Sequence, residues 1–217
     1  MSRPVFNALK ATAVLVIITA VCVGALALCN MFFPKYVPTL DGATAKLINE
    51  ICPTGVSDDI ALSDGYIELL GDDDYGVKLA DYNKANKSAK AEILAVYRQS
   101  KGDNAGAFII EAKSSGRDGD VVVLTAYKNE NIVGATVKKQ GESYWNKLPT
   151  DMFESLVGEN VYSEINLSAK FGKTGATLSL TAVNRAVNIS NSFAKEHNRS
   201  IVKPDDFTVY GHAKESE

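Results

Sequence analysis

The residues with the clearest capacity for chemistry lie in the stretch Lys173–Leu178, whose sequence is KTGATL. A small and flexible step, Gly175-Ala176, precedes Thr177 here, and a strongly periodic segment follows it. The first backbone N–H groups of a helix have no intrahelical acceptor, and the helix dipole favours negative charge at that end. The stretch therefore predicts a phosphate site in which Thr177 offers its hydroxyl as an attachment point.

The Gly-Ala-Thr triplet occurs three times, and the surroundings distinguish the three copies. The copy that ends at Thr44 follows Asp41, whose negative charge would repel a phosphate. The copy that ends at Thr136 lies in a segment with strand character, where ladder hydrogen bonds use the backbone donors. Only the third copy follows a hydroxyl residue, Thr174, and has Lys170 and Lys173 close by. The context therefore selects Thr177.

The segment after Thr177 is the most clearly periodic part of the chain beyond residue 40. At about 100° per residue, one broad face is apolar. This face consists of Leu180, Val183, Ala186, Val187, Ile189, Phe193 and Ala194. The pattern predicts an amphipathic helix packed on a sheet, so that a ligand at its N-terminus would be held by a rigid element.

Four segments upstream have the composition of strands and are separated by Gly, Asn or Asp. They are Glu92–Gln99, Ala105–Ala112, Asp120–Tyr127 and Asn131–Lys138. Their regular spacing predicts an antiparallel meander, and hence an α+β domain with helices on one face of the sheet. Shorter patterns predict a helix capped by Asp41, a weak strand within Ile60–Leu70 and a short helix over Asp151–Val157.

The loop after the predicted sheet contains Tyr144 and Trp145, the latter the only tryptophan of the chain. Both rings could stack on a flat ligand, or they could fill a gap beneath the loop, and the sequence leaves both interpretations open. The two histidines, His197 and His212, stand among polar residues, and we expect them to be solvated.

The N-terminal residues 11–33 contain no charged side chain and are long enough for a transmembrane helix. Basic residues precede this segment, so the positive-inside rule places residues 1–10 in the cytoplasm. Residues 34–40 would then form a juxtamembrane linker, and residues 41–217 one domain on the extracytoplasmic side. The alternatives are a cleaved signal peptide, with a cleavage site near Ala25–Ala27, and a lipid anchor at Cys29.

Composition excludes several classes of protein. The chain has 217 residues, of which 46% are hydrophobic, so it is not a disordered tail. Its net charge of -3 becomes more negative without the N-terminal segment, which argues against a nucleic-acid partner. Cys52 is the only cysteine beyond the predicted span, so the domain has neither an internal disulfide nor the Cys/His spacing of a zinc site.

The stretch Thr174–Thr177, with the helix that follows, resembles the RnfG-like and NqrC-like family of covalent FMN-binding domains, which belong to the Rnf and Nqr complexes. Upstream segments match the strand pattern of that family, and the resemblance covers residue 11 to about residue 195. These segments are Gly106–Lys113, Gly119–Ala126 and Asn131–Ala135.

The resemblance implies that a flavin transferase joins FMN, taken from FAD, through its phosphate to Thr177. It also implies that Thr174, Gly175 and Ala176 shape the turn and that Leu178 is a nearby contact. The protein would then be an electron-transfer subunit of a membrane-bound, ion-translocating ferredoxin:NAD+ oxidoreductase, with the other Rnf subunits as partners. A threonine hydroxyl is a poor nucleophile at neutral pH, which agrees with the need for a separate transferase.

The sequence departs from the family pattern at two places. Phe171 occupies the position of an aspartate in the transferase motif, and Glu142-Ser143-Tyr144-Trp145 replaces a Glu-Thr-Pro-Gly loop in which only Glu142 persists. The flavin contacts implied for this loop are therefore Glu142, Tyr144 and Trp145. Two alternatives stay open: an anchored scaffold or assembly subunit of the same fold without flavin, and a stand-alone extracellular flavin reductase.

Overall fold

The computed structural model describes residues 14–16, 18–21, 23–24, 40–172 and 175–201. The chain divides into two units, residues 1–38 and residues 39–217. The described residues of the first unit are helical, in pieces of two to four residues. The remainder of the predicted linker and N-terminus lies outside the described residues.

The predicted fold class needs one correction in the first unit. A membrane-spanning helix requires about 20 consecutive residues. Within the described ranges, no helix is both long enough and apolar enough to cross a membrane. The single N-terminal transmembrane helix over residues 11–33 is therefore not supported, and the described part of the chain is α+β.

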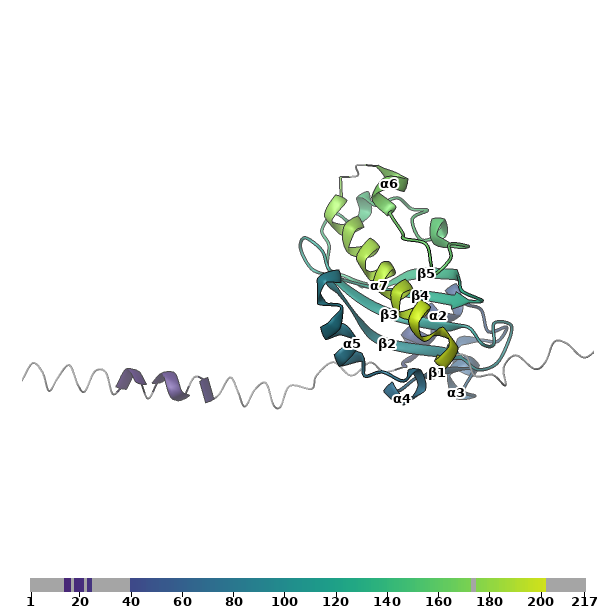
Figure 1. Ribbon diagram of the computed structural model, residues 1–217, viewed down its shortest axis with the longest axis horizontal. Coiled ribbons are helices and arrows are strands. Elements are labelled where there is room, and N and C mark those ends of the chain that lie inside the picture. The colour runs from purple at the N-terminus through teal and green to yellow at the C-terminus, as the bar shows by residue number, and fades with distance from the viewer. Residues whose placement is uncertain (1–13, 17, 22, 25–39, 173–174, 202–217) are drawn as a thin grey trace, which may run out of the picture. The chain divides into compact units, whose positions relative to one another are not determined.

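The second unit is built on a five-stranded antiparallel sheet in which each strand pairs with the next along the chain (Figure 1). The strands are β1 (Ile67–Leu69), β2 (Ala91–Gln99), β3 (Phe108–Ser115), β4 (Asp120–Lys128) and β5 (Asn131–Gln140). The predicted meander is confirmed. Strand β3 begins three residues later than predicted, because the chain still turns at Gly106, whose φ of +81° lies in the left-handed region.

Helices lie before β1, between β1 and β2, and after β5 along the chain. They are α2 (Gly42–Ile51), α3 (Asp58–Ser63), α4 (Asp72–Tyr75), α5 (Leu79–Ala85), α6 (Leu167–Phe171) and α7 (Thr177–Ile201), with short 3-10 turns η1 (Lys87–Ala89), η2 (Trp145–Lys147) and η3 (Glu154–Leu156). The long helix α7 crosses the sheet, as Figure 1 shows. Its bounds confirm the amphipathic helix predicted after the Gly-Ala-Thr stretch, and α2 confirms the helix predicted after Asp41.

Buried side chains form one core on each face of the sheet. The first contains the apolar face of α7, including Leu180, Val183 and Phe193. The second contains Ala45 and Ile48 of α2 with Ala61 of α3. The prediction that helices cover one face is therefore wrong, because helices lie against both.

Three local predictions also fail. Only Ile67–Leu69 of the weak strand pattern forms a strand, while Asp58–Ser63 is helical and has two aspartates in its first turn, where the dipole favours them. Residues 151–157 form only the 3-10 turn η3. His197 is not solvated: its side chain is 17% exposed, its ring lies 4.6 Å from that of Phe193, and its Nδ1 lies 3.1 Å from the Tyr75 carbonyl oxygen.

Candidate functional site

Thr177 is the first residue of α7, a helix of 25 residues, and its side chain is exposed. The helix geometry starts here, since the Leu180 N–H donates to the Ala176 carbonyl at 2.9 Å and the Thr181 hydroxyl donates to the Thr177 carbonyl at 2.8 Å. Gly175 is exposed and Ala176 is 4% exposed. Thr174 and Lys173 lie outside the described residues. The predicted attachment residue therefore lies at the surface, on the end of a packed helix.

Glu142 connects this helix end to two loops of the sheet. Its carboxylate, in a residue only 5% exposed, accepts a hydrogen bond from the Ser179 hydroxyl at 2.5 Å. The same carboxylate accepts from the backbone N–H groups of Asp118 and Gly119 at 2.9 and 3.0 Å. The turn between β3 and β4, the loop after β5 and the first turn of α7 therefore meet at one side chain.

Glycines make room for the Glu142 carboxylate. A Cβ atom on Gly116 would lie 2.3 Å from Glu142 Oε1, and one on Gly119 would lie 2.9 Å from Gly141 Cα. Both distances are shorter than side chains tolerate, so any larger residue would displace the carboxylate or the loop.

The hydrogen bonds decide the charge of Glu142. Burial would raise the pKa of this carboxyl, but the Ser179 hydroxyl and the backbone N–H groups of Gly119, Asp118 and Arg117 favour the charged form, and the net pKa is lowered. Glu142 is thus an anion at neutral pH. Its negative charge at the start of α7 has to be offset before a phosphate can bind there.

Two cations lie around the exposed ring of Tyr144. The Lys147 Nζ lies 4.6 Å and the Arg117 Cζ 5.3 Å from the ring centroid, which are cation–π distances. Lys147 also reaches the turn before Thr177, since a Cβ atom on Gly175 would lie 3.0 Å from its Cδ and 3.9 Å from its Nζ. Lys147 therefore places a positive charge beside the predicted phosphate site.

The sequence pattern favours Lys170 and Lys173 as the flanking cations and does not indicate Lys147. Lys170 is used elsewhere, because its ammonium lies 3.4 Å from the Glu159 carboxylate. Lys147 and Gly175 are brought together only by the tertiary fold. The Lys147-Leu148-Pro149 sequence carries no local signal for this role.

The other predicted contacts divide between surface and core. Leu178 is 57% exposed and Tyr144 36% exposed, so both are accessible near the helix start. Trp145 is partly buried and packs against the core under α7, and Phe171 does the same. The structure thus brings Tyr144, Leu178 and Glu142 to the surroundings of Thr177 and directs much of the Trp145 ring inward.

In the two other Gly-Ala-Thr triplets, the threonine already takes part in a helix cap or a strand pair. The Asp41 carboxylate already accepts the Thr44 N–H at 2.7 Å, and this bond lowers the pKa of Asp41. Thr136 pairs with Leu124 inside the sheet.

No protein-family model matches the chain, and no curated protein matches it either. Within the ranges that the structure describes, no group of three or more His, Cys, Asp or Glu side chains is placed to hold a metal ion. The fold and site define an α+β domain with a meander sheet and an exposed threonine at the start of its longest helix.

Proposed function

We propose that this chain is an electron-transfer flavoprotein subunit that carries FMN in phosphoester linkage on Thr177, within an Rnf-type ferredoxin:NAD+ oxidoreductase. One observation supports this most directly: Thr177 is exposed at the first position of α7, with the Lys147 side chain against the preceding Gly175. The helix dipole stabilises a phosphate at a helix start, and a nearby ammonium supplies its counter-charge.

Each residue of the site has a role that its position fits. Lys147 offsets the phosphate charge. Arg117, which lies over the same Tyr144 ring, adds a second positive charge nearby. Glu142 fixes Ser179 and thereby the direction of the first turn. The exposed ring of Tyr144 and the side chain of Leu178 offer apolar surface to a flat ligand. Bound flavin would supply the redox chemistry that amino-acid side chains lack.

Surface position suits an electron carrier, which has to present its cofactor to a donor and an acceptor. The proposed partners are the other membrane subunits of such a complex, and a flavin transferase during maturation. The proposed place is the cell membrane, with the domain on the extracytoplasmic side.

The test is the intact mass of the full chain co-expressed with a flavin transferase. Wild-type protein should carry the mass of FMN and retain flavin fluorescence on a denaturing gel. Thr177→Ala should remove both, while Thr181→Ala, one turn further along α7, should keep both. Flavin that survives Thr177→Ala would refute attachment at this residue.

A second candidate is a scaffold or assembly subunit that lacks flavin. Phe171 favours it, because an apolar side chain packed against the core stands where the transferase motif has an acid. The same measurement separates the two: a wild-type mass equal to the bare polypeptide, in the presence of an active transferase, supports the scaffold. Phe171→Asp would then test whether this position alone prevents attachment.

A further inference from the structure

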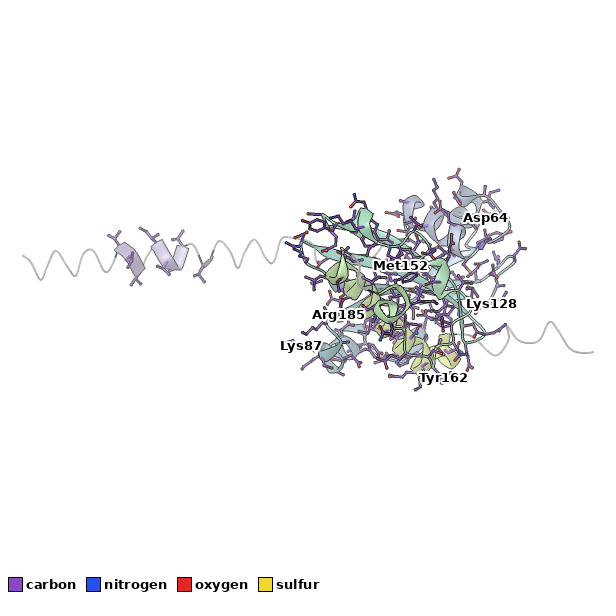
Figure 2. The ribbon with its side chains drawn as sticks, turned by 90° about the horizontal axis from the view of Figure 1, so that it is seen from above. Asp64, Lys87, Lys128, Met152, Tyr162 and Arg185 are labelled. Carbon is purple, nitrogen blue, oxygen red and sulfur yellow. The ribbon has the colours of Figure 1, made fainter. Side chains whose placement is uncertain are left out.

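A cleft of about 420 Å³ opens between the start of β2, the end of β3 and helix α7. Its lining includes Lys87, Lys90, Glu92, Lys113, Ser114 and Arg185. Arg185 stands eight residues after Thr177, which corresponds to about 12 Å along the helix axis. Figure 2 shows the Lys87 and Arg185 side chains close to each other on this side of the domain. We call this region the basic cleft.

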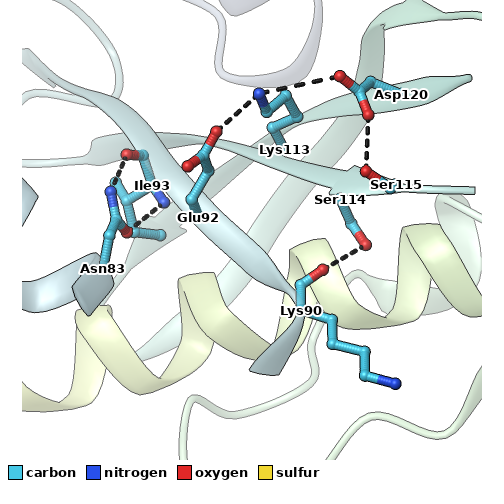
Figure 3. A network of polar contacts seen from close by, with 8 residues as sticks. All are labelled: Asn83, Lys90, Glu92, Ile93, Lys113, Ser114, Ser115 and Asp120. Carbon is cyan, nitrogen blue, oxygen red and sulfur yellow. Dashed lines mark hydrogen bonds and ion pairs between the residues drawn. The ribbon is translucent and has the colours of Figure 1, made fainter. Parts of the chain in front are cut away.

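The charges that line the basic cleft are unbalanced, with four basic residues and one acidic residue. Lys113 is already paired, since its ammonium lies 2.7 Å from Glu92 and 3.8 Å from Asp120 (Figure 3). The pairing with Glu92 uses the only carboxylate of the lining. Lys87, Lys90 and Arg185 therefore face the cleft without an acidic partner among the described residues.

Arg185 is the least expected of these cations, because its side chain is half-buried. The other two arginines whose side chains the structure describes both have carboxylates: Arg98 lies 2.9 Å from Glu68, and Arg117 lies 3.6 Å from Asp118. The Arg185 side chain has no such pair and no hydrogen bond within the described part of the chain. Its guanidinium lines the cleft with its donors unused by acceptors of the described residues, and an external anion would supply acceptors.

Partly buried hydrogen bonds hold the walls of the basic cleft. The Asn83 amide both donates to the Ile93 carbonyl and accepts from the Ile93 N–H at 2.8 Å, as Figure 3 shows. The Ser114 hydroxyl donates to the Lys90 carbonyl at 3.0 Å. Lys90 has a φ of +54°, a left-handed conformation that few non-glycine residues adopt, and its backbone is held on both sides, since its N–H also donates to the Lys87 carbonyl. The cleft is thus formed before any ligand binds.

We propose that the basic cleft binds a small organic molecule through a phosphate monoester group. A monoester carries a charge of about -1.5 to -2 at neutral pH, which suits three unpaired cations better than a single carboxylate does. The guanidinium of Arg185 can bind two phosphate oxygens at once, with Lys87 and Lys90 as point charges. The volume lies within the range of small-molecule sites. This site does not depend on flavin attachment.

The test is calorimetric titration of the full chain with ribose 5-phosphate, with ribose as the matched ligand that lacks the phosphate. We expect saturable binding of ribose 5-phosphate, with a Kd of roughly 1 mM or tighter, and none of ribose. Arg185→Gln should weaken binding about tenfold or more, because a charge-assisted pair is lost. Circular dichroism establishes that the variant is folded, and Lys90→Gln provides a second, surface substitution with the same expected direction.

Two control variants make the site assignment falsifiable. Lys46→Gln removes an exposed charge on α2 and should leave the affinity unchanged, and Thr177→Ala tests whether the phosphate binds at the start of α7 instead. Absence of saturable binding, binding of ribose with equal affinity, or an equal loss in Lys46→Gln would overturn the proposal. A loss in Thr177→Ala with none in Arg185→Gln would overturn it as well, because the phosphate would then lie at the start of α7.

Discussion

At the scale of single residues, Glu142 is the connection between the sheet and the start of α7. Its carboxylate receives hydrogen bonds from Ser179, Asp118 and Gly119, in a space that glycines leave open. Donors directed at one carboxylate favour its charged form, which explains why its pKa is lowered despite burial. Because the Glu142 charge would repel a phosphate at Thr177, the positive charge of Lys147 is needed to offset it.

Glu142→Gln should destabilise the domain. An amide nitrogen cannot accept the hydrogen bonds that one carboxylate oxygen receives, so a donor loses its partner at a cost of about 1–3 kcal/mol. Urea unfolding followed by circular dichroism measures the change. Glu154→Gln, at an exposed position of η3, is the matched control and should have little effect. Equal stability of the two variants would show that the Glu142 network contributes nothing.

The wild-type protein and Glu142→Gln should also differ in pH dependence. The pKa of Glu142 in the folded state is lower than its ordinary value of 4.5. Its stabilisation is therefore fully present above pH 4.5 and is lost as the pH falls through the folded-state pKa. The stability difference between wild type and Glu142→Gln should shrink in acid, as urea midpoints at pH 7 and near pH 3 would reveal. A difference that grows as the pH falls contradicts the lowered pKa.

At the scale of elements, α2 lies so close to β5 that only glycine fits at the contact. A Cβ atom on Gly134 would lie 2.2 Å from the Ile51 carbonyl oxygen and 2.9 Å from the Ile51 Cβ. The first of these is a backbone atom, which cannot move aside as a flexible side chain can. The approach of helix to strand on this face of the sheet therefore depends on Gly134.

Gly134→Ala should destabilise the domain by roughly 1–3 kcal/mol, because the helix has to shift away from the strand. Gly42→Ala, in helix α2, is the control, since a Cβ atom at Gly42 meets nothing within 4 Å. Thermal unfolding should show a lower Tm for Gly134→Ala and an unchanged or higher Tm for Gly42→Ala. A Tm of Gly134→Ala equal to that of wild type would mean that the helix adjusts without cost.

At the scale of the whole domain, one sheet supports a core on each face. Phe193 of α7 is fully buried in one core, where its ring contacts Tyr75 and Tyr82, and Ile48 of α2 is fully buried in the other. Alternate residues of the same strands enter the two cores. Loss of either core therefore exposes one side of every central strand, which couples the two halves in unfolding.

We expect residues 39–217 to unfold in a single transition. The only tryptophan, Trp145, packs against the core under α7 and reports locally, while far-ultraviolet circular dichroism reports on the whole domain. Phe193→Ala should lower stability by about 3–5 kcal/mol and Ile48→Ala by about 2–5 kcal/mol, with both probes shifting together in each variant. Separate tryptophan and circular dichroism midpoints in Ile48→Ala would show that the two cores unfold independently.

The sequence by itself determined the elements whose signal is local. Strand-like composition between Gly, Asn or Asp residues indicated β2, β4 and β5, and the helical periodicity after Thr177 indicated α7. The Asp41 cap was predictable because its partner, Thr44, stands three residues away. The prediction for the ambiguous segment Ile60–Leu70 was right only for Ile67–Leu69, since a few apolar residues suit a strand and a helix turn equally.

Only the tertiary structure decided which distant groups meet. Glu142 and Ser179 are 37 residues apart in the chain, and Lys147 reaches Gly175 from the loop after β5. The partial burial of His197 likewise depends on Tyr75, which the packing of α4 against α7 brings to it, whereas Phe193 lies one turn away on α7 itself. Periodicity states which face of an element is apolar, but the partner of a polar side chain depends on strand register and helix placement, and these are set by the whole chain.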